Sequence, residues 1–136
     1  MKLLLDINIW IDIASRPISQ PDSLELLRQI EQKGQTLLFP LCGYTTTHFL
    51  LKRILGEPAA LDFLHTLSKR AVRFVPFTEN EVTLARKLTF SDHEDACIAA
   101  SAISAGADWI VTRDNKGYRR SPVPSISPKQ LFRKLL

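Results

Sequence analysis

Short apolar runs that stop abruptly constrain the fold of this chain more than any other feature of its sequence. The first run, at 2–5, is ended by Asp6, and two others lie at 36–39 and 109–112. Runs this short, with no alternation of polar residues, are typical of strands that are buried on both faces of a parallel sheet. Parallel strands need long crossover connections, which are usually helices, so the runs predict an α/β fold.

Capping residues and glycines mark helices between these runs. The first predicted helices run from the N-cap Asp22 to Gly34, over 44–55 and from Pro58 onward. Two more follow capping boxes: one begins after the box at 78–81, and one covers 95–105 after the box at 91–94. A last helix is expected at 129–135, and further strands are expected at 72–77 and 123–126. This alternation predicts an α/β sandwich with a mainly parallel central sheet. The length of 136 residues and the lack of linkers or repeats predict a single domain over 1–136.

The composition is that of an ordinary globular protein, with 45% hydrophobic and 24% charged residues. No stretch approaches the roughly 18 apolar residues of a membrane span, and Asp6 interrupts the N-terminal apolar run too early for a signal peptide. Cys42 and Cys97 form no C-x-x-C pair, which favours reduced thiols in a cytoplasmic protein. The net charge of +4 is compatible with a polyanionic partner and equally with a slightly basic solvated surface.

Acidic residues occur where apolar runs stop or where a helix starts. Asp6 and Asp114 follow predicted strands, and Asp92 and Asp95 open an alanine-rich helix. The carboxyl ends of parallel strands meet at one edge of the sheet, where ligands bind in open α/β folds. Carboxylates at the mouth of buried strands are costly unless a positive charge neutralises them. Their convergence would therefore favour a divalent metal site.

Three polar neighbours are candidates for support of these acids. Asn8 would orient Asp6, and Thr112 would project to the same side of its strand as Asp114. Glu94 lies in the same helical turn as the Asp92/Asp95 pair. Each has a simpler interpretation: Asp6 or Asn8 caps a helix, Glu94 complements the helix dipole, and the segment after Thr112 is a turn.

Three motifs together resemble the PIN-domain family, and most closely its prokaryotic VapC-type toxins. They are Leu5-Asp6-Ile7-Asn8, Asp92-x-Glu94-Asp95-Ala96, and the segment from Gly106 to Asp114, and the resemblance covers essentially the whole chain. It implies a three-layer α/β/α sandwich and a Mg²⁺- or Mn²⁺-dependent ribonuclease. It also implies that Asp6, Asp95 and Asp114 are the catalytic acids, with Asp92 as an extra acidic position and with Asn8 and Thr112 in support.

The resemblance further implies partners. RNA would be the substrate, and the basic residues Arg113, Lys116, Arg119 and Arg120 beside Asp114 would follow its backbone, unless they form only a solvated loop. A small antitoxin protein would cover an apolar groove, and a second copy of the chain would complete a homodimer. Apolar residues on the helices at 44–55 and after Pro58 are candidates for these contacts, or else belong to the core; they are Phe49, Leu50, Leu51, Phe63 and Leu64.

One position departs from the family pattern. His48 stands where the family usually has a glutamate, in Thr45-Thr46-Thr47-His48. His48 is either a weak metal ligand or a residue of the helix surface without metal contact. The departure keeps an alternative open, in which the chain is a degenerate PIN domain that binds RNA or protein without cutting. A phosphatase with an aspartate nucleophile is a further alternative, but Asn8 replaces the second acid of its D-x-D motif.

Overall fold

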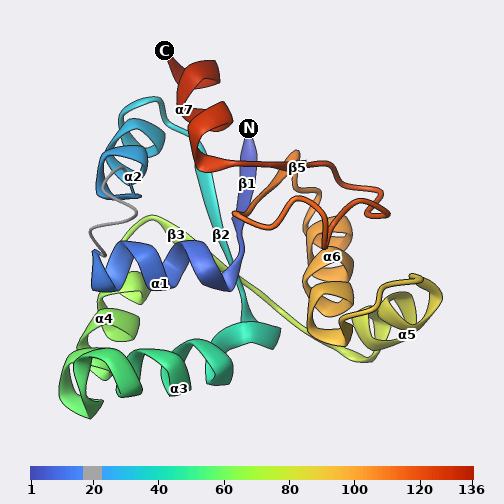
Figure 1. Ribbon diagram of the computed structural model, residues 1–136, viewed down its shortest axis with the longest axis horizontal. Helices are drawn as coiled ribbons and strands as arrows, with labels where there is room; N and C mark the ends of the chain where they lie inside the picture. Colours follow the sequence, from blue (N-terminus) through green and yellow to red (C-terminus); the bar gives the residue numbers. More distant parts are fainter. Residues whose placement is uncertain (17–22) are drawn as a thin grey trace.

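A computed structural model describes residues 1–16 and 23–136 of the chain. Figure 1 shows the arrangement of its helices and strands. In chain order they are β1 (Lys2–Leu5), α1 (Ile7–Ser15), α2 (Ser23–Gln32), β2 (Thr36–Pro40), the 3₁₀ turn η1 (Leu41–Gly43), α3 (Tyr44–Leu55), α4 (Glu57–Lys69), β3 (Val72–Val75), α5 (Glu79–Lys87), α6 (His93–Ala105), β4 (Trp109–Val111), β5 (Ser125–Ile126) and α7 (Pro128–Leu135).

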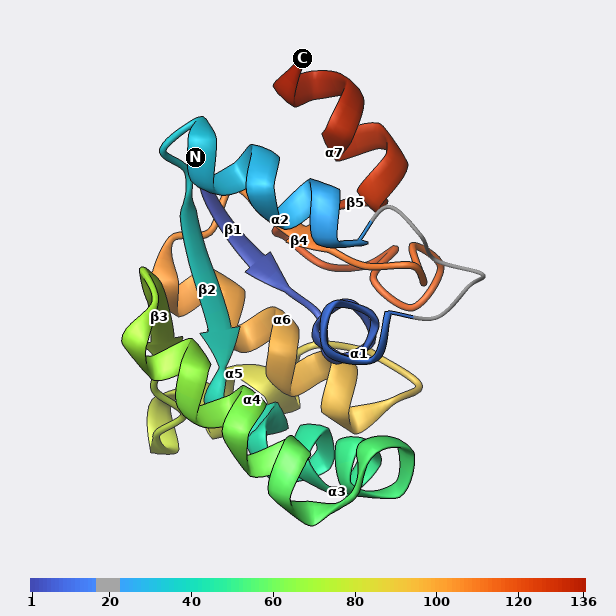
Figure 2. The same ribbon diagram turned by 90° about the vertical axis from the view of Figure 1, so that its left-hand side faces the viewer.

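The strands form one sheet in the order β3-β2-β1-β4-β5, and every pair in it is parallel. Alternate residues of β1 face opposite sides: Leu3 and Leu5 pack with α1, α2, α4 and α7, whereas Leu4 packs with α6. Helix α5 packs in turn against α6 through Ala85. Figure 2 shows these layers on either side of the strands. The prediction of a three-layer α/β/α sandwich is thus confirmed, and the sheet is parallel throughout.

The strand order places a topological switch point at the carboxyl ends of β1 and β4, and we call this edge of the sheet, where the acids lie, the crevice. Strand β1 has β2 on one side and β4 on the other, so the connections leave it in opposite directions. Ligands bind at such a switch point in open parallel sheets. The backbone N–H of Asp6 donates to the carbonyl of Val111 at 2.9 Å, which joins the two strand ends directly. The residues that follow these two strands, Asp6 and Thr112 among them, therefore start next to each other at this edge of the sheet.

Helix α1 is predicted only by the alternative in which Asp6 or Asn8 caps a helix, and the structure confirms that alternative for Asp6. Isoleucines at 7, 9, 11 and 13 alternate with other residues, a period of two that favours a strand, and β-branched residues form helices less readily than most. Packing decides otherwise. Trp10 is fully buried in the core, with its ring centroid 5.4 Å from that of Phe39, and Asp6 caps the helix by accepting from Ile7 N–H at 2.7 Å.

Most other predicted elements are confirmed with shifted ends. Strand β3 stops at Val75, and β5 contains only two residues. Helix α6 begins earlier than predicted, and its N-cap is Asp92 in place of the first residue of the predicted capping box at 91–94; the Asp92 carboxylate accepts from Asp95 N–H at 3.0 Å. The predicted N-cap Asp22 lies outside the described residues.

The described part of the chain bears on two further predictions, on membrane spans and on the cysteines. None of the helices within 1–16 and 23–136 is long and apolar enough to cross a membrane. Cys42 and Cys97 are free thiols, and the sulfur of Cys42 lies 3.8 Å from the hydroxyl of Ser101.

Candidate active site

Asp6 lies at the floor of the crevice, with only 5% of its surface exposed. One carboxylate oxygen accepts from Ile7 N–H, and the other accepts from the Thr112 hydroxyl at 2.8 Å and from the Asn8 amide at 3.3 Å. Burial raises the pKa of Asp6, and the hydrogen bonds from Thr112 and Ile7 offset part of that rise. The carboxylate is therefore held in one orientation by donors from the first turn of α1 and from the residue that follows β4.

Thr112 links Asp6 to the loop that carries Asp114. The side chain of Thr112 is fully buried, and its hydroxyl accepts from the backbone N–H of Asp114 at 3.0 Å. The Asn8 amide donates to the same hydroxyl at 3.3 Å, and its carbonyl accepts from Arg113 N–H at 3.3 Å. Asn8 and Thr112, both expected to support the acids, thus connect the ends of two neighbouring strands.

Asp95 reaches the crevice from the first turn of α6 and is partly buried. Burial, followed by the negative charges of Asp92 and Asp6, raises the pKa of Asp95 from an ordinary value of 3.8 to about 6. Asp114 adds to this repulsion. Acids from separate parts of the chain therefore act electrostatically on one carboxyl group. The exposed Asp92 contributes both this charge and the helix cap.

A tyrosine that the sequence analysis does not single out lies between two of these acids. The hydroxyl of Tyr118, a residue only 2% exposed, donates to Asp95 at 3.3 Å and also interacts with Asp6. Burial and these two carboxylates raise the pKa of Tyr118, so the phenol keeps its proton. No spacing pattern could have identified it, because the contact depends on how the loop after β4 folds back onto α6.

Gly117 lies where the carboxylates of Asp95 and Asp114 approach each other. A Cβ atom at position 117 would lie 2.9 Å from Oδ2 of Asp95 and 2.8 Å from Oδ2 of Asp114, closer than such contacts occur. The backbone N–H of Gly117 also donates to the other oxygen of Asp114 at 3.1 Å. Both acids therefore point to one spot that only glycine leaves open, although Asp114 itself is exposed at the rim.

Glu94 lies next to Asp95 in the first turn of α6. It accepts from the Thr46 hydroxyl at 2.8 Å, and its charge adds to the rise in the pKa of Asp6. His48, at the position of the family glutamate, instead contacts Glu57, with Nε2 and Oε1 3.0 Å apart. Of the two interpretations of His48, the structure therefore favours the residue of the helix surface.

The four basic candidates divide into two groups. Arg113 forms an ion pair with Asp12, which is 3% exposed, through Nε–H donation at 2.7 Å. This contact engages Nε and Nη2 of Arg113, so an ion pair within the protein competes with the predicted contact to a nucleic acid backbone. Asp12 is buried as well as paired. Lys116, Arg119 and Arg120 line a hollow beside the acids.

The donor chemistry of the acids fits Mg²⁺ or Mn²⁺, which prefer carboxylate oxygens. None of Asp6, Asp92, Asp95 and Asp114 takes part in an ion pair among the described residues, so their mutual repulsion has no cationic partner there. The acids do not, however, form a ready-made cage. Within 1–16 and 23–136, no three Asp, Glu, His or Cys side chains are grouped closely enough to hold a metal ion.

In the metal-free protein we expect Asp95 to make folding more favourable at pH 5 than at pH 7.5. Its folded pKa of about 6 lies above its ordinary 3.8, so the folded state keeps a proton that the unfolded chain loses, and this stabilisation disappears as the pH rises through 6. Asp95→Asn should raise the unfolding free energy at pH 7.5 by about 1 kcal/mol, because partial exposure screens the charges. Urea titrations in EDTA at both pH values test this, with Asp62→Asn on α4 as the control. Equal pH dependence of Asp95→Asn and wild type would contradict it.

Comparison with known proteins identifies the family. A family model described as PIN domain matches residues 2–116, so the chain belongs to the PIN-domain family. A comparison with curated proteins gives no match.

Solved structures with the same fold include VapBC2 from Rickettsia felis bound to a DNA fragment from its promoter, with 20% identity, a TM-score of 0.69, and coverage of 93% of this chain and 98% of the other. FitAcB from Neisseria gonorrhoeae has 18% identity, a TM-score of 0.71, and coverage of 93% and 98%. VapC20 from Mycobacterium tuberculosis, a toxin that cleaves the sarcin–ricin loop, has 17% identity, a TM-score of 0.65, and coverage of 79% and 86%. At these identities the likeness establishes the fold.

Proposed function

We propose that this chain is a divalent-metal-dependent endoribonuclease and the toxin of a type II toxin–antitoxin pair. Asp6, Asp95 and Asp114 are its catalytic acids, and Asp92 is a further metal-binding residue. The observation that supports the proposal is the proximity of Asp6, Asp95 and Asp114 at the switch point of the sheet. Tyr118 contacts Asp6 and Asp95, and Gly117 lies between the carboxylates of Asp95 and Asp114. The membership of the PIN-domain family supports the same reaction class.

The chain has no need of a nucleophilic side chain for this reaction. The chemistry that a bound Mg²⁺ or Mn²⁺ supplies is Lewis acidity, which activates water and offsets the charge of the phosphate. Thr112, Asn8 and Ile7 N–H keep the Asp6 carboxylate in a fixed orientation. Asp95 must be ionised to bind a cation, and its pKa of about 6 leaves it mostly charged at neutral pH. Glu94, oriented by Thr46, adds negative charge to the same crevice.

The proposed toxin role rests on the solved structures that share this fold. VapC20 is a toxin, and VapBC2 was solved with promoter DNA, so we propose a small antitoxin partner and a cytoplasmic location for this chain as well. Of the apolar residues expected to contact a partner, Phe49 is 56% exposed on α3, whereas Leu51 and Leu64 belong to the core. Ile54 and Leu61 are further exposed apolar residues on α3 and α4. These helices are our candidates for the antitoxin or homodimer contact.

One observation favours the competing function, a PIN domain that binds without cutting. The acids form no closed group of three metal donors among the described residues, and His48 does not replace the family glutamate at the site. In that case the crevice would hold no cation tightly enough to support hydrolysis. Metal binding therefore separates the two functions.

We expect millimolar Mn²⁺ or Mg²⁺ to raise the melting temperature of the protein, because a ligand that binds only the folded state stabilises it. A single-stranded RNA should be cut in the presence of either ion and stay intact in EDTA. His48→Ala should keep both properties, since His48 contacts Glu57 and not the acids. The absence of both a thermal shift and cleavage in the wild type would favour the binding function.

A further inference from the structure

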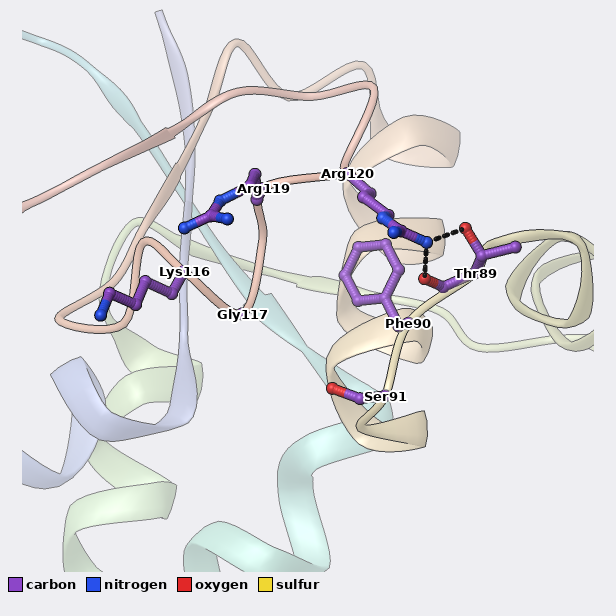
Figure 3. A pocket seen from close by; sticks show the side chains of 7 residues that line it. All are labelled: Thr89, Phe90, Ser91, Lys116, Gly117, Arg119 and Arg120. Atoms are coloured by element: carbon purple, nitrogen blue, oxygen red, sulfur yellow. Dashed lines mark hydrogen bonds between the residues drawn. The ribbon is translucent and has the colours of Figure 1, made fainter.

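A hollow of about 450 Å³ lies directly beside the acidic crevice. Its walls are two loops, one between α5 and α6 and one after β4, which face each other in Figure 3. We call it the basic pocket; its lining side chains are Thr89, Phe90, Ser91, Lys116, Arg119 and Arg120, with Gly117 between the loops. The volume lies within the roughly 300–1,000 Å³ that is usual for sites of small ligands.

Gly117 is shared between the basic pocket and the acidic crevice. On one side it lines the pocket, and on the other its missing Cβ leaves space for the carboxylates of Asp95 and Asp114. Ser91 makes a second connection, because the next residue, Asp92, caps α6. A polymer whose phosphate reaches the acids would therefore place its neighbouring unit in the pocket.

The charge of the pocket selects an anion. Lys116, Arg119 and Arg120 are exposed, and no carboxylate is part of the lining. Among the described residues, neither Lys116 nor Arg119 forms an ion pair. Arg120 reaches across to the other loop, and its Nη1 donates to the hydroxyl of Thr89 at 3.2 Å. Lys116 and Arg119 extend from their loop on the side away from Phe90 (Figure 3) and are free to contact a phosphate that flanks the pocket, whereas Arg120 holds the two loops together.

Phe90 gives the pocket an aromatic surface. Its ring projects toward the loop that carries Gly117 (Figure 3) and meets the ring of Tyr118 edge to face, with centroids 6.2 Å apart and an interplanar angle of 72°. The contact with buried Tyr118 fixes the ring orientation. Aromatic side chains beside phosphate-binding cations are the usual means of holding an unpaired nucleotide, because every base has a face that stacks.

We infer that the basic pocket binds one unpaired nucleotide of the RNA strand next to the scissile phosphate. The base stacks on Phe90, and the phosphate contacts Lys116 and Arg119. This inference rests on the proposed ribonuclease function, whose active site the pocket adjoins. It predicts that the enzyme prefers single-stranded RNA, since a paired base cannot leave its duplex to reach Phe90 without loss of pairing.

Binding without cleavage provides the test. In EDTA, fluorescence anisotropy would give the Kd for a single-stranded RNA and for inorganic polyphosphate of equal charge, which has no bases. We expect Phe90→Leu, which keeps an apolar side chain against Tyr118, to weaken RNA binding about tenfold and to leave polyphosphate binding unchanged. Arg119→Ala should weaken the binding of both RNA and polyphosphate. It should also lower the slope of log Kd for RNA against the logarithm of the salt concentration by about 1. Phe90→Tyr should bind RNA like the wild type.

The control variants carry the same kinds of substitution at residues outside the basic pocket. Phe132→Leu on α7, which packs on the other side of the sheet, and Arg86→Ala on α5 should leave both Kd values unchanged. The wild type itself should bind the RNA about tenfold more tightly than polyphosphate, a comparison that depends on no variant being folded. Equal affinity of the wild type for both polymers, or a folded Phe90→Leu variant with the wild-type Kd for RNA, would overturn the inference and leave at most a general anion site.

Cleavage assays with Mn²⁺ distinguish this inference from the proposed function. Wild-type protein that binds RNA in the predicted manner but never cuts it would contradict the ribonuclease and preserve the pocket. A folded Phe90→Leu variant that cuts RNA as fast as the wild type at limiting substrate would preserve the ribonuclease and contradict the pocket.

Discussion

Asp6→Asn is expected to lower metal-dependent RNA cleavage at least about 100-fold, the order of loss that follows removal of one preorganised electrostatic group. Asp6 is the most buried of the acids in the crevice, and its orientation is fixed by Thr112, Asn8 and Ile7 N–H. An amide of the same shape carries no charge, so it removes much of the attraction for a divalent cation. The loss should appear in kcat and in metal affinity together.

The folded state should survive this change. Asparagine is as good an N-cap as aspartate, so its side-chain oxygen would still accept from Ile7 N–H at the start of α1. The new amide N–H₂ would face the Asn8 amide and the Thr112 hydroxyl, which already accepts from Asp114 N–H and from Asn8, so these hydrogen bonds would be weakened. The melting temperature in EDTA should stay close to that of the wild type, because the loss of these hydrogen bonds is offset by the removal of a buried charge. This readout separates a catalytic defect from unfolding.

Controls and a cellular readout complete the test. Asp62→Asn removes an exposed carboxylate on α4 and should cleave like the wild type. If the chain is a toxin, its expression alone should slow bacterial growth, and Asp6→Asn should relieve that effect. Cleavage by folded Asp6→Asn at the wild-type rate would refute the assignment of the site. Normal growth with the wild-type chain would refute only the toxin role.

Arg113→Ala is expected to lower the free energy of unfolding by about 2–3 kcal/mol. The change leaves the carboxylate of Asp12, which is 3% exposed, without its cationic partner. Loss of one partner from a fully buried pair costs about 3–5 kcal/mol, and we expect less here because the Arg113 side chain is 42% exposed. Asp12→Asn should cost less than Arg113→Ala, since the arginine left behind can be hydrated.

Urea denaturation of both single variants and of the double variant measures this asymmetry. Arg119→Ala is the matched control, because Arg119 is exposed and forms no ion pair among the described residues; its effect should stay within about 0.5 kcal/mol. The same samples report on function. If Arg113→Ala is as stable as the wild type but loses RNA affinity, the ion pair with Asp12 is not its main role, and Arg113 belongs with the nucleic acid contacts after all.

The sequence by itself determined the layers of this protein and the edge of the sheet where its acids lie. Runs as short as 2–5 and 109–112 bury residues on both faces, which requires parallel strands with helices on either side, and Asp6 and Asp114 follow such runs directly. Capping signals placed most helices, because hydrogen bonds between a side chain and the backbone are local. The alternating isoleucines of α1 favour a strand locally, but burial of Trp10 in the core outweighs that preference, so only the capping residue Asp6 indicated this helix.

Only the tertiary structure decided which side chains share a site. Tyr118 lies 23 residues from Asp95, and Arg113 lies 101 residues from Asp12, so no local sequence motif contains both partners of either contact. The loop after β4 pairs Arg113 with a buried carboxylate on α1, and its contacts with α6 and the preceding loop form the basic pocket and bring Gly117 between two acids. Such contacts join segments remote in the chain, and their energies depend on burial and distance, which exist only after the chain has folded.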